Sequence, residues 1–464
     1  MSIEVPAPAR RPAPPGAPDF WTRDRVADAL GGGPRGSDWF GRVWTDTRTL
    51  QQGDLFVALV GERFDAHDFL RDAVAAGASG VVVSDARRAA GLGVPAYVVA
   101  DTTRALGALG RYRRRAWNGP VVGVVGTNGK TSTKELLRAA LGARLEVHAT
   151  TGNLNNLVGA PLTLLAIPDH ADVAVVEMGT NQPGEVAALR AIVEPDIVVV
   201  TSIAEEHLEG LGDLAGVMRE ELAACDGAKV VMTPAAQPEV AAAAQGRATR
   251  IMTAGLDAGD VRADRWSVDA EGLGVAEVGG VAVRPPARGV HNLRNAMLAV
   301  AVAAECGVSV EDAARGIAGA TMPPMRVHWE RIGQATLIND AYNSNPGSAR
   351  AALELLEHAG QGRQRVAILG TMLELGAQGP ALHDDVIRAA LATPVELVVG
   401  VGEFAQALAR AGATGSRVLA SPDVESLWGM LEPRLQRDAV ILLKGSRGVR
   451  LERLVPPITA WAGA

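Results

Sequence analysis

The glycine-rich segment Gly123-Val-Val-Gly-Thr-Asn-Gly-Lys-Thr-Ser132 constrains the fold of this 464-residue chain more than any other feature. It overlaps a β-branched run, residues 121–125, which predicts a buried strand. It leads into residues 130–141, where Leu137 and Leu141 predict one apolar helix face. In such a strand–loop–helix unit, backbone N–H groups of the turn and the helix N-terminus form a nest for phosphate oxygens. The segment therefore predicts an α/β fold with a phosphate-containing ligand at a strand end.

The side chains of this loop have separate expected roles. We expect Lys130 to reach the outer phosphates of a nucleotide and the Thr131 hydroxyl to bind Mg²⁺. The spacing departs from the G-x-x-x-x-G-K-[ST] pattern, because Val124 stands five positions before Gly129. An incidental glycine turn is the alternative, but the flanking strand and helix favour a nucleotide site. The candidate ATP-binding residues of the loop are Gly126, Thr127, Asn128, Gly129, Lys130, Thr131 and Ser132.

Two further polar residues follow predicted buried strands. Glu177 comes directly after residues 173–176, and His207 follows residues 196–201. In a parallel sheet these strand ends lie at the same edge as the phosphate loop. Glu177 is thus a candidate magnesium carboxylate. A helix N-cap at Glu177 and an ordinary surface histidine at His207 are the alternatives.

Three α/β units in series are predicted from the alternation of apolar runs and helical stretches. The first unit ends in a basic helix, residues 102–117, whose arginines we interpret as a solvated face. Short antiparallel strands are predicted over residues 254–286, inside the second unit. The predicted division is a disordered Pro-rich tail (residues 1–20) and three domains (residues 21–118, 119–322 and 323–464).

Composition excludes several classes of protein. There are 45 basic and 52 acidic residues, so the net charge of −7 gives no basic field for non-specific nucleic-acid binding. Two cysteines, Cys225 and Cys306, cannot form a disulfide framework or a four-ligand zinc site, and we interpret them as buried apolar residues of a protein in the reducing cytoplasm. We find no signal segment and no apolar run of the ~20 residues that a spanning helix needs, and we expect no integral membrane association.

With these motifs in place, the chain resembles the Mur ligases, ATP-dependent enzymes that build the peptidoglycan stem peptide. The loop resembles the family's nucleotide signature, Glu177-Met-Gly its magnesium glutamate and His207 its second-metal histidine. The resemblance implies catalytic roles for Lys130, Glu177, His207 and Arg326, and ATP contacts from His291, Asn292, Asn295, Arg326 and Asp340. It also implies ATP and Mg²⁺ as cofactors and a three-domain α/β architecture: a small UDP-binding domain, a central P-loop domain with a parallel sheet, and a C-terminal Rossmann-like domain.

Four sequence blocks are most similar to the family members that add D-alanyl-D-alanine: residues 151–156 with 159–164, residues 340–346, residues 372–376 with His383, and residues 444–447. This similarity implies ligation of that dipeptide to UDP-N-acetylmuramoyl-tripeptide through an acyl phosphate, in the cytoplasm and by a monomer. The block Asp46-Thr-Arg48 resembles the segment that binds the UDP end, with a surface ion pair as the alternative for Arg48. The substrate-binding residues implied by these blocks are Thr47, Arg48, Asn153, Asn155, Asn156, Tyr342, Asn343 and Asn345.

Two positions depart from the family pattern. Relatives often carry a carbamylated lysine fourteen residues after the metal histidine, where this chain has Glu221. We hypothesise that its carboxylate replaces the carbamate as a metal ligand, against the alternative of a glutamate on the helix surface. Thr371 stands where an aspartate is common.

Three other functions are the alternatives. The diaminopimelate-adding ligases usually carry an Asp-Asn-Pro-Arg run, which this chain lacks. Folylpolyglutamate synthases have no place for a UDP-binding block. A P-loop switch that regulates a partner is disfavoured by the candidate metal ligands and by the third-domain ATP contacts.

Overall fold

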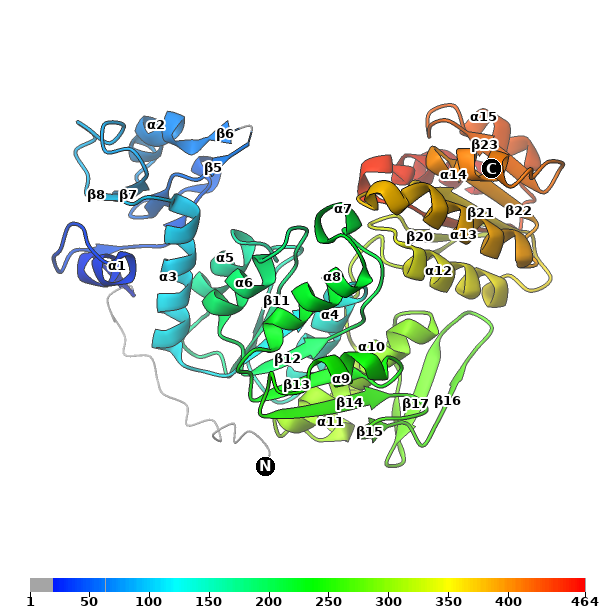
Figure 1. Ribbon diagram of the computed structural model, residues 1–464, viewed down its shortest axis with the longest axis horizontal. Coiled ribbons are helices and arrows are strands. Elements are labelled where there is room, and N and C mark those ends of the chain that lie inside the picture. Colours follow the sequence, from blue (N-terminus) through cyan, green and yellow to red (C-terminus); the bar gives the residue numbers. More distant parts are fainter. Residues whose placement is uncertain (1–19, 63, 464) are drawn as a thin grey trace.

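The computed structural model describes residues 20–62 and 64–463, so the tail expected over residues 1–20 lies outside it except for Phe20. Three lobes, each built on a parallel or mostly parallel sheet, follow one another along the chain. In Figure 1 the N-terminal and C-terminal lobes stand on opposite sides of the central lobe. In the described part of the chain, no helix is both long and apolar enough to cross a membrane.

The N-terminal lobe is built on a four-stranded parallel sheet in the order β3-β4-β7-β8. Its strands are β3 (Val43–Trp44), β4 (Leu55–Val57), β7 (Gly80–Val83) and β8 (Ala96–Val98). Two antiparallel pairs accompany it, β1 (Trp21–Thr22) with β2 (Trp39–Phe40) and β5 (Val60–Gly61) with β6 (Phe64–Asp65). Its helices are α1 (Arg23–Leu30), α2 (Leu70–Ala75) and α3 (Thr102–Trp117).

Helix α3 has the predicted bounds, but our interpretation of its arginines was wrong for two of them. Arg113 and Arg114 are buried. Arg113 pairs with Asp169 at 2.6 Å and Arg114 with Asp196 at 2.9 Å. Because both acids belong to the central lobe, α3 ties the first two lobes together, as its position in Figure 1 shows. The hydrophobic pattern of a single helix does not reveal such distant acidic partners.

The central lobe contains a seven-stranded parallel sheet in the order β10-β11-β9-β12-β13-β14-β15. Its strands are β9 (Val121–Val125), β10 (Val147–Ala149), β11 (Val173–Glu177), β12 (Ile197–Val200), β13 (Val230–Pro234), β14 (Arg250–Gly255) and β15 (Val261–Arg262). The core strands are apolar and buried along their length, as expected for a parallel sheet covered on both faces. The predicted strands at residues 121–125, 173–176 and 196–201 are therefore confirmed.

Helices cover both faces of this sheet. They are α4 (Lys130–Leu141), α5 (Gly159–Leu165), α6 (Glu185–Val193), α7 (Leu208–Leu211), α8 (Leu214–Leu222), α9 (Pro238–Ala243), α10 (Val290–Glu305) and α11 (Val310–Ala318). The predicted antiparallel insertion is confirmed as the sheet β16 (Arg265–Val268), β17 (Gly274–Val278) and β18 (Val281–Val283). Cys225 and Cys306 are buried in the central core, as we interpreted them.

The C-terminal lobe has a six-stranded sheet in the order β19-β20-β24-β21-β22-β23, parallel except for the edge strand β19. Its strands are β19 (His328–Ile332), β20 (Ala335–Asp340), β21 (Arg365–Gly370), β22 (Leu397–Val401), β23 (Val418–Ser421) and β24 (Val440–Lys444). Its helices are α12 (Pro346–Ala359), α13 (Gly379–Ala392), α14 (Glu403–Arg410), α15 (Trp428–Leu431) and α16 (Val455–Gly463). The fold is thus the predicted α/β class, with the phosphate loop in the central sheet.

Candidate active site

A cavity of about 800 Å³ lies where the phosphate loop faces the C-terminal lobe. Its lining comes from the loop after β9, the segments that follow β11 and β12, and the start of α10. The C-terminal lobe contributes the residues directly before β19 and those at and after the end of β20. It brings together residues that are more than 200 positions apart in sequence. The predicted residues that line it are Thr127, Asn128, Gly129, Lys130, Thr131, Ser132, Asn153, Asn155, Asn156, Glu177, His207, His291, Asn292, Asn295, Arg326, Asp340, Tyr342 and Asn343.

Two glycines allow the phosphate loop to take its path. Gly126 has φ +114°, and a Cβ there would lie 2.6 Å from Thr201 Oγ1 and 2.8 Å from Ser202 O. Gly129 has φ +89°, and a Cβ there would lie 2.8 Å from the Asn295 side chain. Both positions therefore require glycine for conformation and for space. The loop is held against the β12 end by the bond from Thr127 N–H to Ser202 O, 2.7 Å.

Lys130 begins α4 and its side chain folds back onto the loop. The Nζ atom donates to Gly126 O and to Thr127 O, the latter at 3.2 Å. Both acceptors are neutral carbonyl oxygens. A phosphate oxygen is a stronger acceptor for an ammonium group, since charge-assisted hydrogen bonds are about twice as strong as neutral ones. The ammonium group is thus placed to exchange these carbonyls for the phosphates of a nucleotide.

Glu177 ends β11 and fits the predicted magnesium site. Its Oε1 atom accepts from the Thr131 hydroxyl at 3.2 Å and from Asn155 Nδ2 at 2.9 Å. Its Oε2 atom is buried and has no hydrogen-bond partner. A carboxylate oxygen without a partner beside a threonine hydroxyl is suited to a hard divalent cation. Thr131 and Glu177 thus place two oxygen atoms where such a cation could bind, and in the described part of the chain no cluster of three or more His, Cys, Asp or Glu side chains adds to them.

The second predicted metal site has a different arrangement. The Nδ1 atom of His207 contacts Glu374 Oε2 from the C-terminal lobe, and Nε2 lies 3.5 Å from Glu206 Oε1. Glu221 is buried, and its Oε2 atom accepts from Gly126 N–H at 2.7 Å. Burial raises the pKa of the Glu221 carboxyl, and the charge of Lys130 acts in the opposite direction. Glu221 thus lies under the phosphate loop, not at the helix surface, and its role as a metal ligand stays a hypothesis.

Three of the residues expected to contact ATP, His291, Asn292 and Asn295, lie together at the start of α10. His291 and Asn292 line the cavity, with Asn292 Nδ2 3.2 Å from His291 Nε2. Asn292 also donates to Arg288 O at 2.8 Å, which fixes the amide orientation. Desolvation lowers the pKa of His291, while the carboxylate of Asp340 acts to raise it. A neutral imidazole offers both a donor and an acceptor to a purine edge.

The C-terminal lobe contributes a cation and a carboxylate. The Arg326 guanidinium lies 4.2 Å from the centre of the Tyr342 ring. Asp340 accepts from Val327 N–H at 3.1 Å and pairs with Lys444 Nζ at 2.9 Å. Arg326 and Asp340 therefore face the same cavity as the phosphate loop, as the resemblance implied.

Direct bonds join the central and C-terminal lobes beside the cavity. The amides of Asn128 and Asn345 form a reciprocal pair, with distances of 3.2 and 2.8 Å. Asn343 Nδ2 donates to Glu206 Oε1 at 2.8 Å. Asn345 also caps the start of α12. Two of the predicted substrate residues, Asn343 and Asn345, thus hold the two lobes together in this state.

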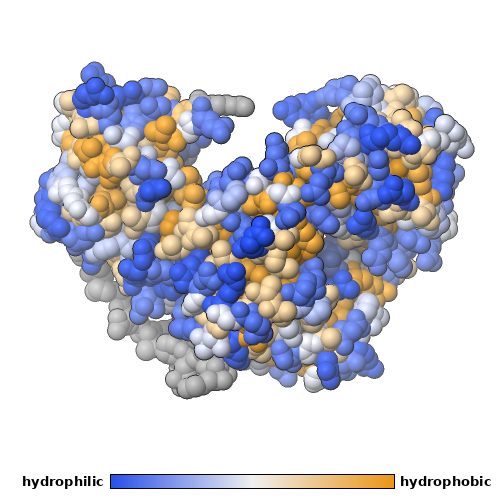
Figure 2. All heavy atoms as spheres, viewed as in Figure 1, coloured by the Kyte–Doolittle hydropathy of each residue, from blue (hydrophilic) through white to orange (hydrophobic). Residues whose placement is uncertain are grey.

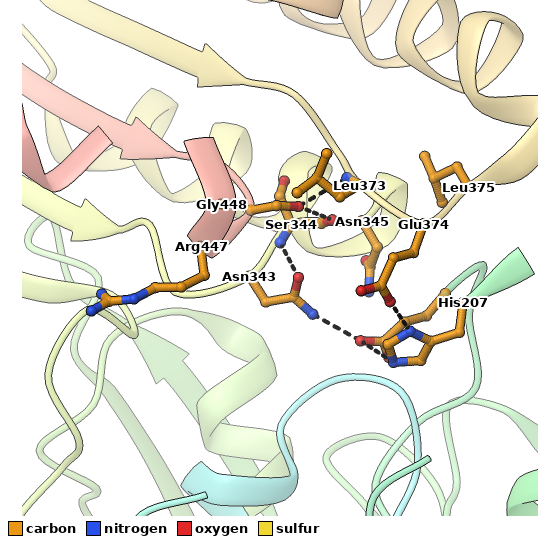
Figure 3. Close-up of a pocket in the computed structure, with 11 residues that line it drawn as sticks. His207, Asn343, Ser344, Asn345, Leu373, Glu374, Leu375, Arg447 and Gly448 are labelled. Carbon is orange, nitrogen blue, oxygen red and sulfur yellow. Dashed lines mark hydrogen bonds and ion pairs between the residues drawn. The ribbon is translucent and has the colours of Figure 1, made fainter. Parts of the chain in front are cut away.

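A second cavity of about 120 Å³ adjoins the first and shares Glu206, His207, Asn343 and Glu374 with it (Figure 3). Ser344 also lines it, and the buried Ser344 hydroxyl has no hydrogen-bond partner. A cavity needs about 10–15 Å³ on this measure to hold one water, so this cavity has room for several waters or for a small ligand. The small cavity is therefore a polar side chamber with room for such a ligand.

Two predicted residues lie away from both cavities. Thr47 and Arg48 are in the 3₁₀ helix Thr47–Thr49 of the N-terminal lobe. Arg48 pairs with Asp46 at 2.7 Å, and its side chain is 85% exposed. An exposed ion pair of this kind adds little to stability, because water screens it. The structure therefore has the surface pair that we considered as the alternative, and the UDP contact stays a prediction.

Sequence reasoning missed several residues of the site. Glu206 and Glu374 line both cavities, and Lys444 holds Asp340. Glu206 directly precedes His207, and Lys444 ends strand β24. The position of Lys444 at a strand end was therefore a usable signal. Glu374 belongs to residues 372–376, a block that resembles the family, and its contact with His207 was not predicted.

The comparisons with known proteins agree with this geometry. Residues 124–303 match the family model described as the Mur ligase middle domain, and residues 325–447 match the model described as the Mur ligase glutamate ligase domain. The chain is 34% identical to the UDP-N-acetylmuramoyl-tripeptide–D-alanyl-D-alanine ligase of Escherichia coli strain K12, over 94% of this chain and 97% of that one.

Solved structures give the same assignment. The crystal structure of MurF from Acinetobacter baumannii superposes with a TM-score of 0.86 and 31% identity, covering 95% of this chain and 99% of that one. The structure of MurF ligase from Thermotoga maritima in complex with ADP has a TM-score of 0.78 and 26% identity, covering 91% and 97%. The chain therefore belongs to the Mur ligase family, in the branch of the UDP-N-acetylmuramoyl-tripeptide–D-alanyl-D-alanine ligases.

Proposed function

We propose that this chain is the ATP-dependent ligase that joins D-alanyl-D-alanine to UDP-N-acetylmuramoyl-tripeptide, giving the pentapeptide precursor of peptidoglycan, ADP and phosphate. The observation that carries the proposal is the shared cavity, in which Lys130 and Thr131 of the phosphate loop face Arg326 and Asp340 of the C-terminal lobe. We also propose the domain division at residues 118 and 322, a monomer as the active form, and the cytoplasm as the compartment where ATP and a UDP-linked precursor meet.

In the first step, the terminal carboxylate of the tripeptide attacks the γ-phosphorus, forming an acyl phosphate and releasing ADP. Lys130 and Arg326 would hold the negative charge of the transferring phosphoryl group from two sides, since positioning and neutralisation dominate such reactions. A Mg²⁺ ion held by Thr131 and Glu177 would supply further charge neutralisation on the nucleotide phosphates. Asn155 keeps the Glu177 carboxylate oriented through its bond of 2.9 Å.

In the second step, the amine of the dipeptide attacks the acyl carbon and phosphate leaves. We propose that the dipeptide occupies the small cavity, because this cavity opens beside the nucleotide cavity and because carboxylates and an unpartnered hydroxyl line it. Its ammonium group would lie near the carboxylates of Glu206 and Glu374, and one of these would take the proton that the nitrogen loses before it attacks. The Ser344 hydroxyl would hydrogen-bond its peptide group.

Phosphate release from Mg-ATP tests the function. The purified protein would be assayed with the UDP-tripeptide alone, with D-alanyl-D-alanine alone, and with both, and the product identified by mass spectrometry. We expect phosphate and UDP-pentapeptide only with both substrates. Lys130→Ala should abolish acyl-phosphate formation, whereas Lys229→Ala, at an exposed lysine, should match the parent. Release with neither substrate, or turnover by Lys130→Ala, would refute the assignment.

A further inference from the structure

Lys134 is a buried lysine for which the proposed reaction gives no role. Its side chain is 0% exposed, and it does not line either cavity. It lies one helical turn after Lys130 on α4. Burying an ammonium group is costly unless charged or polar partners surround it, so lysines are almost never fully buried without a specific contact. The contacts of Lys134 should therefore indicate what it does.

Those contacts lead to the loop after β10. The Nζ atom donates to Thr150 O at 2.7 Å and to Gly152 O at 3.1 Å, and it pairs with Glu135 at 3.1 Å. Thr150 and Gly152 begin the segment that carries Asn153, Asn155 and Asn156 into the large cavity. Lys134 thus joins the helix of the phosphate loop to the polar segment, residues 150–156.

The polar segment in turn holds Glu177 at two points. The Thr150 hydroxyl accepts from Glu177 N–H at 3.0 Å, and Asn155 Nδ2 donates to Glu177 Oε1 at 2.9 Å. Gly179 N–H also donates to Asn155 O at 2.8 Å. The backbone and the carboxylate of Glu177 are therefore both fixed by a segment whose start is anchored on the Lys134 ammonium.

We propose that Lys134 is a positioning residue that fixes the polar segment, and through it the Glu177 carboxylate, for the metal-bound nucleotide and the UDP-linked substrate. This inference rests on the proposed function for the identity of the UDP-linked substrate. The phosphate loop makes its own bonds to Ser202 and Ala204, which Lys134 does not touch. Loss of Lys134 should therefore weaken metal-dependent binding and leave binding of metal-free nucleotide intact.

The test is Lys134→Met, measured by calorimetry with ADP and by steady-state kinetics. We expect the Kd of metal-free ADP to change less than about twofold. The increase in ADP affinity produced by Mg²⁺ should fall at least tenfold, and the KM of the UDP-tripeptide should rise at least tenfold. The KM of D-alanyl-D-alanine should stay within about twofold. Arg138→Met is the control, because Arg138 lies on the same helix, pairs with Glu135 and is exposed.

A uniform loss of all binding constants, or no change in any, would overturn the proposal. If Lys134→Met does not fold, Thr150→Val replaces it, since it removes the hydroxyl that accepts from Glu177 N–H without changing the side-chain size. An unaltered Mg²⁺ effect in Thr150→Val would then overturn it as well. The ADP measurements need no turnover, so failure of the parent protein to ligate the dipeptide would count against the proposed function alone.

Discussion

Replacement of Glu177 by Gln should change stability in opposite directions with and without metal. The Glu177 side chain is 1% exposed, and its Oε2 atom has no partner. An unsatisfied buried polar group costs about 1–3 kcal/mol, more when charged. Glu177→Gln removes the charge and keeps the Oε1 acceptor for Thr131 and Asn155. We therefore expect the ADP complex of the variant, without Mg²⁺, to be more stable than the parent by about 1 kcal/mol.

Adding Mg²⁺ should reverse that order. A cation at about one hundred times its Kd stabilises the protein that binds it by about 2.7 kcal/mol. The parent should gain this amount and the variant little, which leaves the parent more stable by about 1.7 kcal/mol. For a unit of 150–250 residues, 1 kcal/mol corresponds to about 2–4 °C in Tm. The variant should thus melt about 2–4 °C higher than the parent without Mg²⁺ and about 3–7 °C lower with it.

Differential scanning calorimetry of both proteins with ADP, with and without Mg²⁺, measures this crossover. Glu185→Gln is the matched control, because Glu185 Oε2 already accepts from Thr180 Oγ1, Asn181 N–H and Gln182 N–H. That substitution should lower Tm in both conditions and leave the Mg²⁺ effect unchanged. If Glu177→Gln melts below the parent in both conditions, or gains as much from Mg²⁺, the assignment of Glu177 as a metal ligand fails.

Three more predictions follow from single features. Burial lowers the pKa of His383 below its usual 6.5, so the contribution of this residue to stability is complete above pH 6.5. At lower pH that contribution falls by up to about 1.4 kcal/mol per pH unit, because the unfolded chain takes up the extra proton. Urea unfolding between pH 5.5 and 7.5 should therefore show a smaller change of the unfolding free energy with pH for His383→Gln than for the parent, and an equal change contradicts this. Gly126→Ala should lower the affinity for ADP at least tenfold, because the new Cβ would lie 2.6 Å from Thr201 Oγ1. Gly246→Ala is the control, because Gly246 also has a positive φ, +79°, but has open space around it, so ADP binding should stay unchanged. Calorimetry that finds equal ADP affinities for the two variants refutes the argument. The N-terminal and C-terminal lobes stand apart across an open gap (Figure 2), so a non-hydrolysable ATP analogue with the UDP-tripeptide should reduce the radius of gyration in small-angle scattering, and an unchanged value at saturation counts against closure.

The sequence predicts best those features that are encoded locally. The strand at residues 121–125, the helix at 130–141 and the helix at 102–117 have the predicted bounds, because hydrophobic period and glycine positions determine them over a few turns. Residues at the ends of parallel strands were also predicted correctly as cavity residues, since the topology places those ends at one edge. Glu177 is the example, although its bond to Asn155 was not predicted.

Polar contacts between distant segments could not be predicted in this way. The Asn128–Asn345 pair spans 217 positions, and neither residue differs in its local pattern from an ordinary loop asparagine. The sequence suggests either a metal ligand or a helix-surface glutamate for Glu221. In the structure Glu221 lies under Gly126, because the packing of α8 against the phosphate loop decides which face of that helix is buried. Such contacts depend on how the lobes and helices dock.

The bonding partner of a cation in the cavity determines whether that cation is free to bind a nucleotide phosphate. Lys444 is buried and paired with the Asp340 carboxylate at 2.9 Å, so a phosphate would have to displace a charged partner. Lys130 bonds only neutral carbonyl oxygens, and the Arg326 guanidinium lies over the neutral Tyr342 ring. Exchange of a neutral partner for a charged phosphate oxygen gains a charge-assisted hydrogen bond and leaves no carboxylate unpaired. Of these three cations, Lys130 and Arg326 are therefore available to the triphosphate, whereas Lys444 keeps Asp340 in place.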